Sequence, residues 1–257
     1  MAFHSGRPVP RYDFDAPRLF IDQPMRAGAS LDPDRDQSNY LLNVLRLADG
    51  DRILVFNGRD GEWLAGLRLV SRKVAQLDLF EAVRPQETAP DLHYLFAPLK
   101  HARLDYMVQK AAECGVSRLV PVLTRRTQNT RVNLERMRAN AIEAAEQCGI
   151  LTVPEVDEPR KLEAILERWP TDRLLIVPDE DAPVQDPLAA LSGARERAGR
   201  MAVLIGPEGG FDPAERKMFR ALPNVLVLSL GPRILRADTA AVAALSLVQA
   251  SLGDWRG

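Results

Sequence analysis

The sequence has no long apolar run and few residues of the kinds that bind metals or form disulfides. No stretch of 18 or more apolar residues occurs, and residues 1–7 contain no apolar signal segment, so we expect a soluble, cytoplasmic protein without a membrane-spanning helix. Two cysteines and three histidines are too few for a disulfide framework or a zinc cluster, and we expect no bound metal. Cys114 and Cys148 both precede glycine and are predicted to be small buried side chains.

Charge is nearly balanced over the whole chain but not along it. The net charge is -1, yet the stretch from Lys100 to Arg138 holds nine basic and three acidic residues, a surplus of six positive charges. Within it, residues 124–131 are rich in side chains that donate to phosphate. Two interpretations are equally compatible with this stretch: a surface for nucleic acid, or a solvated face.

The first third of the chain has the pattern of a small β-barrel. Short alternating or β-branched segments lie at 52–56, 62–69 and 74–80, and Asn57-Gly58 is a turn signal between the first two. Residues 84–91 have the composition of a linker. We therefore predict an N-terminal extension over 1–17, a β-barrel domain over 18–83, a linker over 84–91 and a second domain over 92–257.

The second domain alternates predicted strands with predicted helices. The strands are expected at 93–97, 118–122, 173–177, 202–205 and 225–228, and helices near 101–114 and 132–147. Such alternation predicts an α/β fold with a parallel sheet covered by helices on both faces.

Two loops in the last third are the candidate site, because each follows a buried strand and leads into a helix. In the first, Gly206-Pro207-Glu208-Gly209-Gly210-Phe211 precedes a helix start at Asp212-Pro213. Glycines there let the backbone approach a flat ligand, although a tight structural turn would use them too. The loop is neither a Walker A motif nor a dinucleotide fingerprint, which disfavours a phosphate cradle.

The second loop carries two arginines, Arg233 and Arg236, beside branched apolar residues. Guanidinium groups held next to an apolar pocket suit an anionic substrate or a developing negative charge. Either arginine could instead be a solvated or backbone-capping residue. A third loop, residues 177–181, follows another predicted strand and is expected to complete the pocket, unless its acidic residues only face solvent.

Together these motifs resemble the SPOUT superfamily of RNA methyltransferases, and more closely the ribosomal RNA small subunit methyltransferase E family. The resemblance extends over nearly the whole chain, through the segments 17–20, 40–46, 56–58, 109–116, 146–149, 205–211 and 230–239. The combination of Ile-Gly-Pro-Glu-Gly-Gly with Leu-Gly-Pro-Arg-Ile-Leu-Arg-Ala-Asp-Thr-Ala at residues 230–240 is highly specific. Asp238 stands where the family commonly has glutamate, and the extension before Arg18 is longer than usual.

The resemblance implies a fold, a cofactor and a reaction. It implies a PUA-like RNA-binding β-barrel, a SPOUT domain with a trefoil knot, and a homodimer. It implies S-adenosylmethionine-dependent methylation of N3 of a uridine in 16S ribosomal RNA of the small subunit. The cofactor-binding residues expected from it are Leu204, Gly206, Glu208, Gly210, Leu228, Leu230, Gly231, Leu235 and Thr239. The expected RNA-binding residues are Arg18, Arg46, Arg125, Arg126 and Arg131.

Uracil N3 is a poor nucleophile until it loses its proton, so the site must stabilise an anion. Arg236 is the first candidate for this catalytic role and Arg233 the second, since neither loop contains a histidine. Two alternatives stay open: a SPOUT enzyme that methylates transfer RNA or a ribose 2'-hydroxyl, and a non-catalytic RNA-binding assembly factor. The last predicts no cofactor binding.

Overall fold

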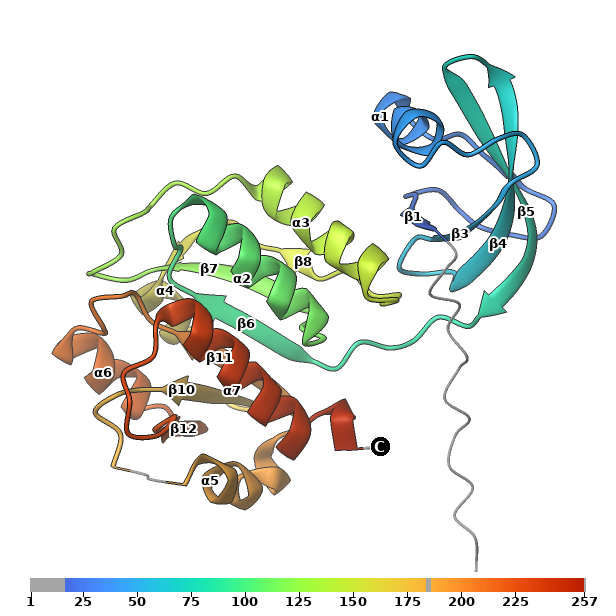
Figure 1. Cartoon of the computed structure of the whole chain (residues 1–257). Coiled ribbons are helices and arrows are strands. Elements are labelled where there is room, and N and C mark those ends of the chain that lie inside the picture. The colour runs from blue at the N-terminus through green and yellow to red at the C-terminus, as the bar shows by residue number, and fades with distance from the viewer. Residues whose placement is uncertain (1–16, 184–185, 257) are drawn as a thin grey trace, which may run out of the picture. The chain divides into compact units, whose positions relative to one another are not determined.

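The computed structural model describes residues 17–183 and 186–256, shown in Figure 1. The predicted N-terminal extension lies outside the described residues except for Pro17. The chain divides into two units, with the division between Glu87 and Thr88.

The first unit is a five-stranded sheet folded around its own apolar core. Its strands are β1 (Arg18–Phe20), β2 (Ser30–Leu31), β3 (Arg52–Phe56), β4 (Glu62–Ser71) and β5 (Val74–Arg84), in the order β1-β3-β4-β5-β2. β1 pairs in parallel with β3, and the other ladders are antiparallel. Alternate residues of β3 and β4, among them Ile53, Val55 and Ala65, are fully buried in the core of this unit.

A short helical segment covers part of this core. Helix α1 (Arg35–Asn39) begins with a capping box, in which Asp34 accepts from Gln37 and Gln37 binds back to Asp34. It continues into a π-helical turn, η1 (Tyr40–Val44), whose Leu41 is fully buried. The segment ends near Arg46, which has a positive φ of 57° and an exposed side chain.

The second unit contains a parallel sheet with the strand order β12-β10-β11-β6-β7-β8, and β9 pairs with β7. The strands are β6 (Leu92–Phe96), β7 (Arg118–Leu123), β8 (Glu155–Val156), β9 (Arg160–Lys161), β10 (Arg173–Pro178), β11 (Arg200–Ile205) and β12 (Val225–Leu228). Every ladder in it is parallel. The carboxyl ends of these strands therefore meet at one edge of the sheet.

Helices cover both faces of this sheet (Figure 1). They are α2 (His101–Glu113), α3 (Leu134–Gln147), α4 (Leu162–Leu166), α5 (Pro187–Gly193), α6 (Pro213–Arg220) and α7 (Ala237–Ser251), with short 3-10 turns η2 (Arg195–Arg197) and η3 (Asp254–Arg256). Along β11, Val203 and Ile205 belong to the core under α2, α3, α5 and α7. Ala202 and Leu204 belong to the core under α4 and α6. The strand is buried on both sides, which explains its continuous apolar run.

The predicted α/β class and parallel sheet are confirmed, and each strand and helix expected from the sequence is present within a few residues of its predicted bounds. One expectation is wrong: Cys114 is buried, but Cys148 is exposed, because it follows the last turn of α3 rather than packing beneath it. The trefoil knot stays a prediction. In the part of the chain that is described, no helix combines the length and apolar character needed to cross a membrane.

Candidate functional site

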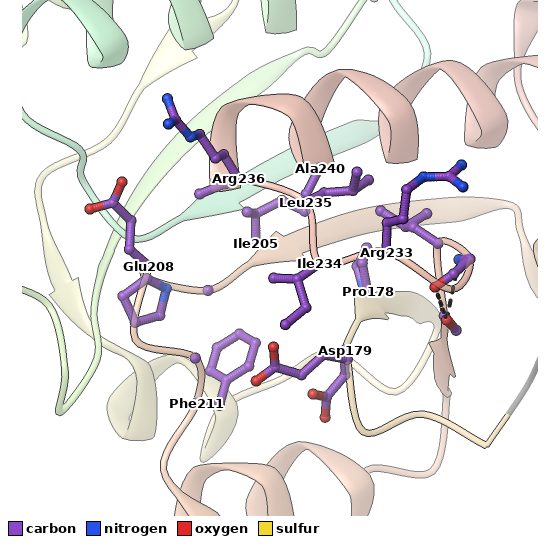
Figure 2. A pocket seen from close by; sticks show the side chains of 18 of the residues that line it. Pro178, Asp179, Ile205, Glu208, Phe211, Arg233, Ile234, Leu235, Arg236 and Ala240 are labelled. Atoms are coloured by element: carbon purple, nitrogen blue, oxygen red, sulfur yellow. Dashed lines mark hydrogen bonds between the residues drawn. The ribbon is translucent and has the colours of Figure 1, made fainter.

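A cavity of about 340 Å³ opens at the carboxyl edge of the parallel sheet, where β10, β11 and β12 end (Figure 2). Three loops form its walls: residues 206–212, here called the glycine loop; residues 229–236, the arginine loop; and residues 179–181, the acidic loop. Its lining residues are Pro178, Asp179, Glu180, Ile205, Gly206, Pro207, Glu208, Gly210, Phe211, Arg216, Ser229, Leu230, Gly231, Pro232, Arg233, Ile234, Leu235, Arg236, Ala237 and Ala240. The two loops singled out in the sequence thus meet, and the third joins them.

Glycines give the glycine loop its shape. Gly210 has a φ of +68°, a conformation that L side chains rarely adopt. A Cβ on Gly206 would lie 2.9 Å from the ring of Phe211, which is buried and packs edge-on against Phe219. Asp212 then caps α6 and Pro213 occupies its first position. At Gly206 and Gly210 the backbone therefore forms the cavity wall without a side chain in front of it.

The arginine loop presents different side chains in different directions. Gly231 has a φ of +107°, and a Cβ built there would meet nothing within 4 Å. Figure 2 shows Ile234 pointing toward Phe211, while the guanidinium groups of Arg233 and Arg236 point the opposite way. The side chain of Ile234 is 85% exposed. The loop thus combines an apolar side chain over the cavity with two cations at its rim.

The acidic loop is held by an arginine that the sequence analysis did not select. Arg216 of α6 donates to both carboxylate oxygens of Asp179. Its Nε lies 3.0 Å from Oδ2 and 3.2 Å from Oδ1, and its Nη2 lies 3.0 Å from Oδ1. The Asp179 side chain is almost fully buried. Its guanidinium also lies 3.1 Å from Asp181 and 3.6 Å from Glu180. The hydrogen bonds to Asp179 raise the pKa of Arg216. The predicted role of this loop in closing the pocket agrees with its position.

Arg103 of α2 joins the glycine loop to the first turn of α7. Its Nε donates to Asp238 at 2.8 Å, and its Nη1 contacts Glu208. The hydrogen bond from Arg103 lowers the pKa of Asp238. The aspartate at position 238 therefore makes a close side-chain contact despite its shorter arm. Nothing in the sequence around Arg103 marks it, since its partners lie more than one hundred residues away along the chain.

The basic loop, residues 124–131, follows β7 and lies against the glycine loop. Arg126 donates to the carbonyl of Gly209 at 2.8 Å. Arg125 lies 3.2 Å from Asp212 and 3.4 Å from Glu163, and its side chain is half exposed. Arg131 is exposed at the far end of the loop. Two of the three predicted RNA-binding arginines of this loop, Arg125 and Arg126, thus contact the glycine loop at the cavity wall.

Some predicted site residues lie elsewhere. Leu204 and Leu228 are buried in the cores behind the cavity, and Thr239 is exposed on α7 without lining it. Arg18 is a correction: we expected it to contact RNA, but it is 6% exposed. Its Nε binds Glu62 at 2.6 Å, and its guanidinium lies 4.5 Å from the ring centre of Phe56. A buried, paired cation of this kind holds β1 to its neighbours rather than reaching a ligand.

Among the described residues, no group of histidine, cysteine, aspartate and glutamate side chains is placed to hold a metal ion. The groups that the cavity wall offers to a ligand are backbone amides and carbonyls, carboxylates and guanidinium groups.

Comparison with known families gives two matches. A family described as RNA methyltransferase domain matches residues 86–249, and one described as RNA methyltransferase PUA domain matches residues 33–79. The ribosomal RNA small subunit methyltransferase E of Rickettsia conorii is 28% identical over 233 residues, 90% of this chain and 94% of its own. The protein of the same name from Synechocystis is 32% identical over 222 residues, 84% of this chain and 71% of its own.

Among the solved structures that are similar over nearly the whole chain, two have S-adenosylmethionine bound. One is a methyltransferase from Legionella pneumophila in complex with S-adenosylmethionine, with a TM-score of 0.79 and 29% identity, covering 93% of this chain and 99% of its own. The other is the ribosomal RNA small subunit methyltransferase E of Neisseria gonorrhoeae bound to S-adenosylmethionine. It has a TM-score of 0.80 and 26% identity, covering 92% of this chain and 98% of its own.

Proposed function

The chain belongs to the ribosomal RNA small subunit methyltransferase E family, and from this premise we propose that it transfers the methyl group of S-adenosylmethionine to N3 of a uridine in 16S ribosomal RNA. The observation that carries the proposal is the cavity between the glycine and arginine loops, with the basic loop bound to its wall. In this assignment residues 18–83 are a PUA-like RNA-binding module, 84–91 a linker and 92–257 the methyltransferase domain.

The cavity fits the cofactor in size and chemistry. Its volume lies within the range of small-molecule sites. Ile205, Leu230 and Leu235 form an apolar wall against which a flat purine can pack. Because Gly206 and Gly210 have no side chain, their backbone N–H and C=O groups can approach the ligand closely. When bound, S-adenosylmethionine supplies an electrophilic methyl group on a cationic sulfonium.

Residues around the cavity have distinct proposed tasks. The backbone of Leu204, Gly206, Gly210, Leu228, Leu230 and Leu235 is proposed to hold the adenine and ribose of the cofactor, although the side chains of Leu204 and Leu228 are buried in the cores. Gly231 lets the backbone of the arginine loop approach the ligand. Glu208 is held by Arg103 at the rim, and Thr239 lies in the first turn of α7.

Arg236 is the proposed catalytic residue. It is the N-cap residue immediately before α7, its side chain is exposed, and it lines the cavity. A uracil that has lost its N3 proton carries negative charge on N3 and the flanking carbonyl oxygens, and a planar guanidinium can donate to adjacent atoms of such an anion. Arg233, on the same loop, is the second candidate.

RNA is proposed to lie along the basic loop and to contact Arg46 in the first unit. Arg125, Arg126 and Arg131 are exposed, and the first two contact the glycine loop, so that the basic loop can hold the phosphates that flank the target. A uridine that is paired or stacked must be splayed out before its N3 can react. Because the proposed substrate is a ribosomal particle, the proposal also places the chain in the cytoplasm.

We further propose a homodimer. Helix α7 is apolar over several faces, and Val242 and Leu247 stay partly exposed beside its buried stripe. Ile234, 85% exposed at the cavity, is suited to contact with a second copy. Sedimentation equilibrium should give twice the chain mass, and a monomer with full activity would remove this part of the proposal.

The deciding experiment is nucleoside analysis. The protein is incubated with labelled S-adenosylmethionine and small ribosomal subunits that lack the modification, and the RNA is digested to nucleosides. We expect label in 3-methyluridine. Label in a 2'-O-methylated ribose or only in transfer RNA would contradict the N3 assignment, and absence of both cofactor binding and label would indicate a non-catalytic assembly factor.

A further inference from the structure

A single buried carboxylate connects the basic loop to the glycine loop. Glu215, on the first turn of α6, is 0% exposed. Its Oε2 accepts from the backbone N–H of Asp212 at 2.8 Å, which completes the capping box of α6. Its Oε1 accepts from the backbone N–H of Arg125 in the basic loop, also at 2.8 Å.

The hydrogen bond from Arg125 to Glu215 is not part of the helix cap. A capping box requires one acceptor at this position, and glutamine serves it as well as glutamate. A buried carboxylate is costly unless its oxygens are hydrogen-bonded, so two backbone donors from two different loops favour the arrangement in which both loops are in place. Glu215 therefore stabilises the basic loop and the glycine loop together.

Arg126 makes a second connection between the same loops. Its Nη1 donates to the carbonyl of Gly209 at 2.8 Å, and its Cδ would lie 3.7 Å from a Cβ on Gly209. The loops leave β7 and β11, which are not neighbours in the sheet, since β6 lies between them. The contacts thus span the width of β6 at the carboxyl edge.

We propose that Glu215 is a positioning residue, with Arg126 as its partner, that couples RNA binding at the basic loop to cofactor binding at the glycine loop. This inference rests on the proposed function, because it needs RNA at one loop and cofactor at the other. Each ligand orders a loop that the other ligand also uses, so each increases the affinity for the other by the same factor.

The test measures that factor with S-adenosylhomocysteine, which has no methyl group to transfer. Equilibrium dialysis gives its affinity for the full chain alone and with saturating small subunits that lack the methyl group. For the wild type we expect subunits to tighten binding by about fivefold or more. Glu215→Gln keeps one acceptor for the cap but not two, and its tightening should fall below about twofold. Arg126→Ala should show the same reduction.

Arg131→Ala is the matched control, because Arg131 lies in the same loop and has no hydrogen bond or ion pair to the glycine loop among the described residues. This variant should bind subunits less tightly, yet saturating subunits should tighten its S-adenosylhomocysteine binding as much as in the wild type. Thermal unfolding checks that Glu215→Gln is folded; if it is not, the exposed Arg126→Ala decides.

Two results overturn the coupling while leaving the proposed function intact. In the first, the wild type binds both ligands, but subunits leave its affinity for S-adenosylhomocysteine unchanged. In the second, subunits tighten S-adenosylhomocysteine binding to the folded variants as much as to the wild type. Failure of the wild type to bind S-adenosylhomocysteine or subunits at all would instead reject the proposed function, and the coupling with it.

Discussion

The arginines around the cavity differ in the number of carboxylates that hold them. Arg216 lies within ion-pair distance of three acidic side chains, and Arg103 of two. Arg233 and Arg236 make no ion pair with any residue in the described part of the chain. An arginine whose donors are already occupied fixes structure, whereas one at a rim without a carboxylate can bind a substrate anion. The geometry thus separates positioning arginines from candidate catalytic ones.

Replacement of Arg236 tests its catalytic role. Arg236→Ala should lower kcat by about 10²–10³ with little change in cofactor affinity, the usual effect of removing one donor to a developing anion. Arg236→Lys should recover only part of the rate, because an ammonium cannot reach adjacent N3 and oxygen atoms together. Raising the pH should partly rescue the alanine variant by supplying more deprotonated uracil. Single-turnover rates at saturating RNA across a pH series measure all three.

A control for this series is Arg220→Ala. Arg220 lies 3.2 Å from Asp179 but does not line the cavity. Its rate should stay near that of the wild type. If Arg236→Ala instead raises KM for RNA and keeps kcat, with no pH rescue, Arg236 binds phosphate and is not catalytic.

The glycines of the cavity wall support a prediction about the cofactor. Gly210→Val should abolish S-adenosylmethionine binding, because a β-branched residue is strained at a φ of +68° and its Cβ would lie 3.1 Å from Glu180. Gly28→Val is the matched control: Gly28 has a φ of +75°, but it lies in the first unit in open space. Calorimetry should find wild-type affinity in the control. Unchanged affinity in a folded Gly210→Val protein would remove the glycine loop from the cofactor site.

At the scale of elements, the sequence predicts those strands, helices and turns that are formed by consecutive residues and are long enough to show a regular spacing of apolar side chains. The strand ending at Ile205, its glycine turn and the cap at Asp212 are consecutive, so both the loop and its place at the sheet edge could be predicted. The two-residue strands β2, β8 and β9 carry no detectable period. Contacts such as Arg103 with Asp238, or Glu215 with Arg125, join residues that are distant in sequence and depend on how the elements pack.

Asp91 joins the amino ends of three neighbouring strands and gives an element-scale prediction. It precedes β6 and pairs with Arg173 of β10 at 2.7 Å and Arg200 of β11 at 2.8 Å. Partial burial raises the pKa of Asp91, but the hydrogen bonds from Arg173 and Arg200 outweigh it and lower the pKa to about 2.

Because the folded pKa lies below the unfolded value of about 3.9, Asp91 stabilises the fold above pH 4 and loses this contribution as the pH falls from about 4 to 2. Asp91→Asn should destabilise the second unit by about 1 kcal/mol at pH 7, a figure reduced for its partial exposure. The difference from wild type should shrink at pH 3, as measured by urea unfolding. Asp172→Asn, at a more exposed partner of Arg200, should change little. A difference that is equal at pH 7 and pH 3 would contradict this assignment.

For the whole molecule, net charge is a poor guide to RNA binding, and the placement of charge is a better one. The chain carries 34 basic and 35 acidic residues, and many of its arginines are neutralised by carboxylates next to them. In the basic loop, Arg125 is half exposed although it lies near Asp212 and Glu163, and Arg131 is exposed and forms no ion pair within the described part of the chain. A sequence shows the excess of basic residues between Lys100 and Arg138 but not which of them lack internal partners. Arg18 illustrates the difference, since its charge is buried against Glu62.

The salt dependence of RNA binding tests this placement. Each arginine bound to a phosphate releases counterions, so the slope of log affinity against log salt falls by up to about one unit for each such arginine that is removed. Arg125→Ala with Arg131→Ala should lower the slope by up to about two units; Arg126 is left in place because it holds Gly209. The control is Arg195→Ala with Arg197→Ala, which removes the same charge from two exposed arginines of η2, next to the amino end of β11 at the opposite edge of the sheet. Filter binding of small subunits over a salt series should show an unchanged slope for the control. Equal slopes for both double variants would mean that the basic loop is a solvated face and that RNA is held elsewhere.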